Sequence, residues 1–354
     1  MKVEWNRAQL CFERYNSLNG IRAYAAIAIL LMHIYANSSY SIDVLQYSPL
    51  LSIFNNLTFL FMMVSAFSMC CGYYERFTSG TISLIDFYKR RYAKIWPYFA
   101  LLVLLDFVLF PSVSSLYEAF ADLTLVFGLL PNASITVIGV GWFLGVVFIF
   151  YMFFPFFCFL ISDKRRAWLA TAITVIYNIL CNEYFLNTDH VVETYYYRHS
   201  FIFCSMFFMV GGLIYLYRKE LIEIVKKTRS ILLIVCIGSF LLYFFFDCLR
   251  TSVMVNLSML VIFALWTIYA ISTNGKIMNN KVTTFIAGIS MEIYLCHMMV
   301  FRVLEKMGLI YMFGYGWMSY VVTAVAVIVG AILFSLCAKL FLKKVRYVVG
   351  KLIT

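Results

Sequence analysis

Long apolar runs separated by short polar stretches dominate the chain. Runs long enough to cross a membrane lie at 21–40, 50–73, 93–110, 141–161, 167–182, 200–217, 230–247, 253–272, 283–304 and 317–342. A further run at 119–131 is shorter, contains Asp122 and ends at Pro131. The pattern predicts an all-α polytopic membrane protein with about ten transmembrane helices and a short segment near 119–131.

The basic residues between the runs decide whether the segment 119–131 crosses. If it does not cross, 24 of the 28 Lys and Arg fall on one side, and the exceptions are Arg198, Arg250, Arg302 and Lys306. If it crosses, the basic loops are split between both faces. Since short basic loops face the cytoplasm, we expect both termini to be cytoplasmic and 119–131 to be re-entrant or to lie on the surface. Residues 131–140 and 182–199 are then both on the outer side.

Composition excludes a soluble globular chain. The sequence is 64% hydrophobic and 13% charged, with a mean hydropathy of +0.89. Basic loops facing anionic lipid explain the net charge of +11, so we expect no nucleic-acid partner. The ten cysteines lie mostly inside apolar runs without metal-ligand spacing, which predicts buried small side chains and no metal site. We found no repeat or linker, and expect residues 1–354 to form a single membrane domain.

The first apolar run carries Arg22 near one end and His33 inside it. On a helix, eleven residues amount to about three turns plus 20°, which puts both side chains on one face about 16 Å apart. With Arg22 at one boundary, His33 lies near the middle of a roughly 30 Å hydrocarbon layer, where polar groups usually face a cavity. This Arg-x10-His pattern resembles the first helix of the integral-membrane acyltransferase family three. Members of that family move acyl groups, usually acetyl from acetyl-CoA, onto sugars and other envelope molecules.

A cluster of cations precedes the third run, where residues 87–98 read FYKRRYAKIWPY. The stretch resembles the family's Arg-x-x-Arg followed by an aromatic residue and proline, with Arg91 first and Lys94 in place of the second arginine. The resemblance implies that Arg90, Arg91 and Lys94, together with Arg22, bind the phosphates of coenzyme A. The alternative is a stop-transfer cluster that faces lipid phosphate.

Two apolar helices carry further family-like motifs. Residues 61–67 read FMMVSAF and look like the family's Ser-Gly-Phe segment with alanine for glycine, which makes Ser65 a candidate substrate-binding residue; the alternative is a packing serine. Residues 141–155 read GWFLGVVFIFYMFFP and are similar to the family's Trp-Phe-Leu … Tyr … Pro helix, which implies a donor-binding Trp142. Val147 stands where many relatives carry glutamate, which favours the branch acting on surface polysaccharide or lipid-linked sugar.

Late in the chain, residues 288–297 read GISMEIYLCH and resemble the family's Ser-x-x-x-Tyr-Leu-x-His pattern. Offsets of four and seven residues place Ser290, Tyr294 and His297 along one helix face, with Glu292 roughly opposite. Tyr294 and His297 are therefore candidate catalytic residues. The alternative for His297 is a hydrogen-bonded core residue.

The loop 182–199 is the one sizeable polar and aromatic loop on the expected outer face. Its Tyr195, Tyr196 and His199 are candidates for stacking and hydrogen-bonding a sugar acceptor. An interfacial aromatic belt is the alternative.

The resemblance implies an enzyme of the bacterial inner (cytoplasmic) membrane that moves an acyl group, usually acetyl, from cytoplasmic acyl-CoA to a hydroxyl of an extracytoplasmic or lipid-linked carbohydrate. His33 is the expected general base, a role that typically contributes about 10²- to 10⁴-fold, and an acyl-His33 intermediate is the covalent alternative. Tyr294, His297 or an arginine would stabilise the oxyanion. A transporter or flippase of a glycan precursor and a structural or partner-binding subunit are the other classes considered. The acceptor's identity and the oligomeric state stay open.

Overall fold

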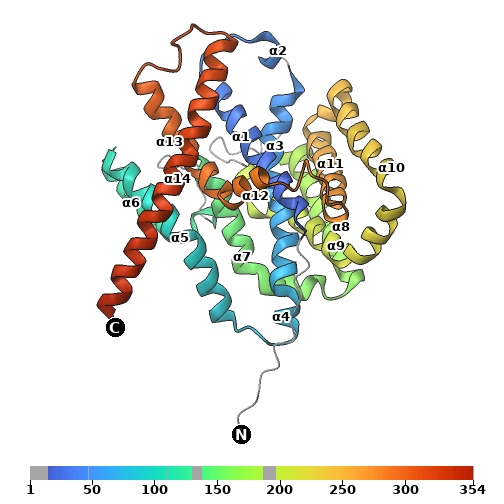
Figure 1. Ribbon diagram of the computed structural model, residues 1–354. Coiled ribbons are helices and arrows are strands. Elements are labelled where there is room, and N and C mark those ends of the chain that lie inside the picture. Colours follow the sequence, from blue (N-terminus) through green and yellow to red (C-terminus); the bar gives the residue numbers. More distant parts are fainter. Residues whose placement is uncertain (1–14, 47, 110, 130–137, 186–196, 354) are drawn as a thin grey trace.

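The computed structural model describes residues 15–46, 48–109, 111–129, 138–185 and 197–353, and within these ranges it contains helices and no strand (Figure 1). The longer helices are α1 (Ser17–Ala36), α3 (Pro49–Met69), α5 (Leu84–Leu109), α7 (Trp142–Ile161), α8 (Lys164–Leu180), α9 (Phe201–Leu216), α10 (Arg218–Phe245), α11 (Ser252–Ser272), α13 (Ser290–Lys306) and α14 (Trp317–Ile353). The shorter elements are α2 (Asp43–Gln46), η1 (Cys70–Tyr74), α4 (Glu75–Thr78), α6 (Val113–Leu123), η2 (Phe127–Leu129), η3 (Gly139–Gly141), η4 (Cys181–Phe185), η5 (Tyr197–His199), η6 (Asp247–Arg250) and α12 (Lys281–Gly288). The predicted all-α class is confirmed.

Each apolar run predicted to span the membrane is helical, and the run 283–304 is divided between α12 and α13. In the described ranges, seven helices are long and apolar enough to cross, and an eighth is added if α12 and α13, bent by 71° at their junction, form one span. The runs at 167–182 and 200–217 correspond to α8 and α9, which have 17 and 16 residues and are not among these candidate spans. The chain is a multi-pass membrane protein, and the described ranges hold seven or eight helices of spanning length beside the expected number of about ten.

The short segment near 119–131 is not a spanning helix. It begins in α6, which has 11 residues and so covers only about half of a hydrocarbon layer, and η2 follows. A non-crossing segment is what the distribution of basic loops predicts. The side that it faces stays a prediction, because residues 130–137 lie outside the described ranges.

One core is aromatic and joins α3, α7 and α9. Phe59 stacks on Phe207 at 4.4 Å, and Phe150 stacks on Phe208 at 4.2 Å between ring centroids. Gly211 permits the close approach of α9 to α3, because a Cβ at this position would lie 2.3 Å from the carbonyl oxygen of Met63. Through α3, this core packs against α1.

A second core joins α1, α5, α13 and α14, with Ile29, Phe99, Ile293 and Val327 fully buried. In Figure 1, α13 and α14 lie on one side of α1, and α8 to α11 gather on the other. Only 11% of the most apolar stretch of α10 is buried inside the protein, as expected of a lipid-facing helix. Because α1 contacts both groups of helices, its Arg22 and His33 side chains are partly covered by them.

Candidate active site

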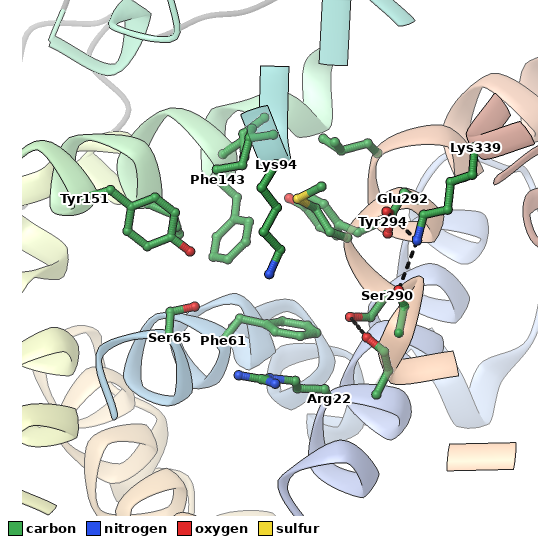
Figure 2. A pocket seen from close by; sticks show the side chains of 17 residues that line it. Arg22, Phe61, Ser65, Lys94, Phe143, Tyr151, Ser290, Glu292, Tyr294 and Lys339 are labelled. Atoms are coloured by element: carbon green, nitrogen blue, oxygen red, sulfur yellow. Dashed lines mark hydrogen bonds and ion pairs between the residues drawn. The ribbon is translucent and has the colours of Figure 1, made fainter. Parts of the chain in front are cut away.

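A cavity of about 370 Å³ lies beside Arg22, between α1, α3, α5, α7, α13 and α14 (Figure 2). We call it the Arg22 cavity. Its polar lining consists of Arg22, Ser65, Lys94, Tyr151, Ser290, Glu292, Tyr294 and Lys339. The structure therefore brings four of the sequence-predicted residues, Arg22, Ser65, Lys94 and Tyr294, to one cavity.

Cations outnumber carboxylates in this cavity, because Arg22, Lys94 and Lys339 line it with Glu292 as the one acidic residue. Arg22 is anchored by a hydrogen bond from its Nη2 to Ser68 Oγ at 2.6 Å. A predominance of cations is the arrangement that phosphate groups require. Within the described part of the chain, no group of three or more His, Cys, Asp or Glu could hold a metal ion.

The cations of the predicted Arg-x-x-Arg-like stretch do not all lie at the cavity. Arg91 lies next to the cavity, with its guanidinium 5.7 Å from the ring centroid of Tyr151, and it donates to the Tyr73 hydroxyl at 2.5 Å. Arg90, one residue earlier on α5, is exposed and does not line the cavity. The helical turn of about 100° between neighbours explains this separation.

A second cavity, of about 490 Å³, lies at His33, where the depth of this residue in the membrane led us to expect one; we call it the His33 cavity. Its polar lining comes from His33 of α1, Asn37 directly after α1, Asp106 of α5, and Arg302 and Lys306 of α13. Arg302 donates through Nη1 to Glu305 at 2.6 Å and through Nη2 to Asn37 Oδ1 at 3.4 Å. The cavity thus mixes both signs of charge with amide and imidazole groups.

His33 and His297 lie against each other, with ring centroids 5.1 Å apart and planes at 79°. His297 Nδ1 is 2.6 Å from the Tyr294 carbonyl oxygen. Since a carbonyl oxygen only accepts, Nδ1 carries the proton, and Nε2 is an acceptor in the neutral ring. Nε2 is buried and has no hydrogen-bond partner among the described residues. His297 is fully buried while His33 lines the cavity, so a molecule there reaches His33.

Tyr294 and Leu295 form the wall between the two cavities. Leu295 lines both of them, and Tyr294 lines the Arg22 cavity. The Tyr294 hydroxyl donates at 2.8 Å to the carbonyl oxygen of Val140, which lines the His33 cavity. The Phe143 ring packs edge-on against Tyr294 at 5.3 Å. Arg22 and His33 share one helix but face different cavities on either side of this wall.

The position of the Glu292 side chain differs from the prediction, which placed it opposite Ser290 and Tyr294. All three side chains line the Arg22 cavity. The chain bends by 71° just before α13, so the cavity surrounds the first turn of the helix instead of meeting one face. Glu292 forms an ion pair with Lys339 at 2.7 Å.

Arg198 is a polar residue near the histidines that the sequence analysis treated only as a loop cation. Its Nη2 donates to the carbonyl oxygen of Asn55 at 2.9 Å and to Asn56 Oδ1 at 3.2 Å. It interacts electrostatically with His33 and Tyr294. Its Nε is buried without a hydrogen-bond partner in the described ranges. The one signal in the sequence is its place among the few cations expected on the outer side.

The remaining candidates lie apart from these two cavities or outside the described ranges. Trp142 stacks on His199 with centroids 4.5 Å apart and planes at 12°, and neither ring lines the Arg22 or the His33 cavity. Tyr195 and Tyr196 lie outside the described residues. The aromatic sugar platform predicted for this loop therefore stays a prediction.

A many-helix membrane domain with polar residues lining two cavities defines a class of integral-membrane enzymes and transporters. The family model for an acyltransferase domain, that of acyltransferase family 3, matches residues 15–338. The chain belongs to this family and is an acyltransferase, as the resemblance of its motifs predicts. No curated protein and no solved structure matches the chain. The family match favours an enzyme over the transporter and the structural subunit.

Proposed function

We propose that this acyltransferase moves an acyl group, with acetyl as the expected group, from cytoplasmic acyl-CoA to a hydroxyl of an extracytoplasmic or lipid-linked carbohydrate. In this proposal it does so in the bacterial inner membrane, with both termini in the cytoplasm. The observation that carries the proposal is the position of Arg22 and His33 on one helix, each facing its own cavity across the wall of Tyr294 and Leu295. Two substrates that approach from opposite sides need this arrangement.

The donor occupies the Arg22 cavity. Coenzyme A carries a 3′-phosphate and a diphosphate, which suit the cations Arg22 and Lys94 and the adjacent Arg91. Lys94 is exposed, so the phosphates contact the open end of the cavity while the pantetheine arm extends along α1 toward the wall. Basic loops on the same side of the membrane support a cytoplasmic donor.

The acceptor enters the His33 cavity, where its hydroxyl meets His33. Asn37, Asp106 and Arg302 offer donors and acceptors that match sugar hydroxyls. His33 takes the hydroxyl proton as the oxygen attacks the thioester carbon. A C–O bond forms, the C–S bond then breaks, and the proton passes from His33 to the departing thiolate of coenzyme A. His297, whose ring packs edge-on against that of His33, orients His33 through this contact.

Arg198 is our preferred donor to the oxyanion among the groups that the sequence left open. The Tyr294 hydroxyl already donates to Val140, and the His297 Nδ1 proton is taken by the Tyr294 carbonyl. Arg198 Nε is buried without a partner in the described ranges and lies in the electrostatic environment of His33. A preorganised donor in a dry site is the largest contribution to many acyl transfers.

The test is release of coenzyme A thiol by the purified protein from acetyl-CoA, with and without a carbohydrate extract of the cell envelope. We expect release that depends on the extract, and a matching acetyl gain in the glycan mass. Stoichiometric thiol release without acceptor, with an acyl group retained on the protein, would support the acyl-His33 route. Absence of acyl-CoA binding and of thiol release would contradict the proposal.

A further inference from the structure

Lys339 reaches the Arg22 cavity from α14, far along the chain from the predicted donor-binding cations (Figure 2). Its Nζ lies 2.7 Å from Glu292 Oε1 and donates to the Gly288 carbonyl oxygen at 3.0 Å. The side chain of Glu292 is 11% exposed and that of Lys339 is 39% exposed. The ion pair therefore joins a nearly buried carboxylate to an ammonium that keeps access to the cavity mouth.

The charges around this pair conflict with the proposed donor. Arg22, Lys94 and Lys339 attract phosphate, whereas Glu292, which lines the same cavity, repels it. Glu292 also occupies one side of the Lys339 ammonium that a phosphate would otherwise contact. A nearly buried carboxylate in a phosphate-binding cavity weakens donor binding. Its presence there therefore requires a separate role.

The mobility of lysine makes an exchange of partners possible. The Lys339 ammonium sits on a flexible four-carbon stem and carries three donors. It can hold the Gly288 carbonyl oxygen while it turns from the Glu292 carboxylate to a phosphate oxygen. Gly288 ends α12 directly before the bend, so this contact keeps the ammonium at the cavity.

We propose that Lys339 is a phosphate-binding residue of the acyl-CoA site and that Glu292 competes with the donor phosphate for it. This inference rests on the proposed function, because it assumes that acyl-CoA occupies the Arg22 cavity. In this arrangement Glu292 holds Lys339 in place and limits the affinity for the donor and for the coenzyme A product. Easier product release is the separate task of the carboxylate.

The test measures coenzyme A affinity by calorimetry in detergent for single and double variants. Glu292→Gln keeps the shape and a hydrogen-bond acceptor for Lys339 but removes the negative charge. We expect coenzyme A to bind about fivefold more tightly to this variant, the scale of one partly exposed ion pair. Lys339→Ala should bind about fivefold more weakly than the parent. Lys343→Ala, an exposed lysine one turn further along α14, is the matched control and should bind as the parent does.

The double variant Glu292→Gln with Lys339→Ala keeps the test valid if Lys339→Ala alone misfolds, because it leaves no buried charge without its partner. Its affinity should be well below that of Glu292→Gln, and the difference measures the contact of Lys339 with phosphate. Comparison with dephospho-coenzyme A shows whether that contact is to the 3′-phosphate or to the diphosphate.

Two results would overturn the inference. One is a Glu292→Gln protein that binds coenzyme A no more tightly than the parent. The other is a double variant whose affinity equals that of Glu292→Gln. Both presuppose that the parent binds coenzyme A. A parent that binds neither coenzyme A nor acetyl-CoA contradicts the proposed function itself, so the two failures are distinguishable.

Discussion

The two cavities differ in how far cations outnumber carboxylates and in the other polar groups that line them. Three cations and one carboxylate face the Arg22 cavity. The His33 cavity combines Arg302 and Lys306 with Asp106, an amide and an imidazole. A phosphate needs an excess of cations, whereas a sugar hydroxyl, which both donates and accepts, is matched by mixed polar groups. The difference supports a donor on one side of the wall and a neutral acceptor on the other.

The same comparison assigns different consequences to two residues of one helix. In the proposed mechanism Arg22 faces the donor side and His33 the acceptor side, so loss of either should affect a different kinetic constant. Uniform effects on binding and turnover would mean that the two cavities act as one.

Replacing His33 should have the largest effect. His33→Ala removes the proposed base and should lower acyl transfer by about 10²- to 10⁴-fold. Acyl-CoA affinity should stay near the parental value, because His33 does not line the Arg22 cavity. Turnover at saturating donor and equilibrium binding, measured on the same preparation, check both parts.

The control for this substitution is Met32→Leu, a conservative change at the preceding, buried position of α1, which should keep most of the activity. A His33→Ala protein with a near-parental rate would exclude His33 as the base. His297→Ala would then be the variant to compare, since His297 Nε2 is the other buried acceptor at this place.

Arg198, which lines neither cavity but interacts electrostatically with His33, tests whether an arginine supplies the oxyanion donor. Arg198→Ala should lower turnover by about 10²-fold and leave the acyl-CoA affinity unchanged. Arg198→Lys keeps the positive charge but lacks the Nε donor, so it should lose nearly as much. Full turnover in the lysine variant would show that only the charge matters, and that Nε plays no part.

The apolar runs and the positions of Arg22 and His33 could be predicted because both depend on local periodicity. A run of hydrophobic residues specifies a membrane helix wherever it lies, and two residues eleven apart share a face on any helix. The interior placement of Ser65 and Tyr294 was likewise anticipated by family-like motifs, and both line the Arg22 cavity.

The roles of Glu292, Lys339 and Arg198 were missed because they depend on contacts between distant parts of the chain. The bend before α13 redirects Glu292 into the cavity, and its partner Lys339 comes from the next helix. Arg198 is held by Asn55 and Asn56, more than 140 residues earlier. Such contacts between distant residues cannot be predicted from composition or periodicity.

On the donor side, Arg22→Ala should raise the acyl-CoA concentration needed for half-maximal rate by about tenfold, the loss of one charge-assisted contact. The rate at saturating donor should fall much less. Arg90→Ala is the control, because Arg90 lies on the predicted cationic stretch but is exposed and outside the cavity. Equal losses in both variants would indicate general attraction by the basic surface instead of a site.

The smallest predicted effect contrasts two buried carboxylates, Glu292 with its lysine and Asp122 without a partner. Asp122 on α6 is 1% exposed, and neither carboxylate oxygen has a hydrogen-bond partner among the described residues. Burial first, and then the charges of Glu118 and Asp106, raise the pKa of Asp122 to about 8. The folded protein therefore holds this proton at neutral pH.

An unfolded aspartate loses its proton near pH 3.9, about four units lower. Between about pH 4 and pH 8 the folded state binds one proton more than the unfolded state, so stability should fall as pH rises through this range. Asp122→Asn removes the titrating group while keeping the shape, and should flatten the dependence and raise the melting temperature at pH 8 by a few degrees. Thermal unfolding in detergent at pH 5 and pH 8 measures both. If the parent and the variant lose the same stability between pH 5 and pH 8, the prediction is wrong. Asp122 would then be charged in the folded protein and stabilised by a group outside the contacts described above.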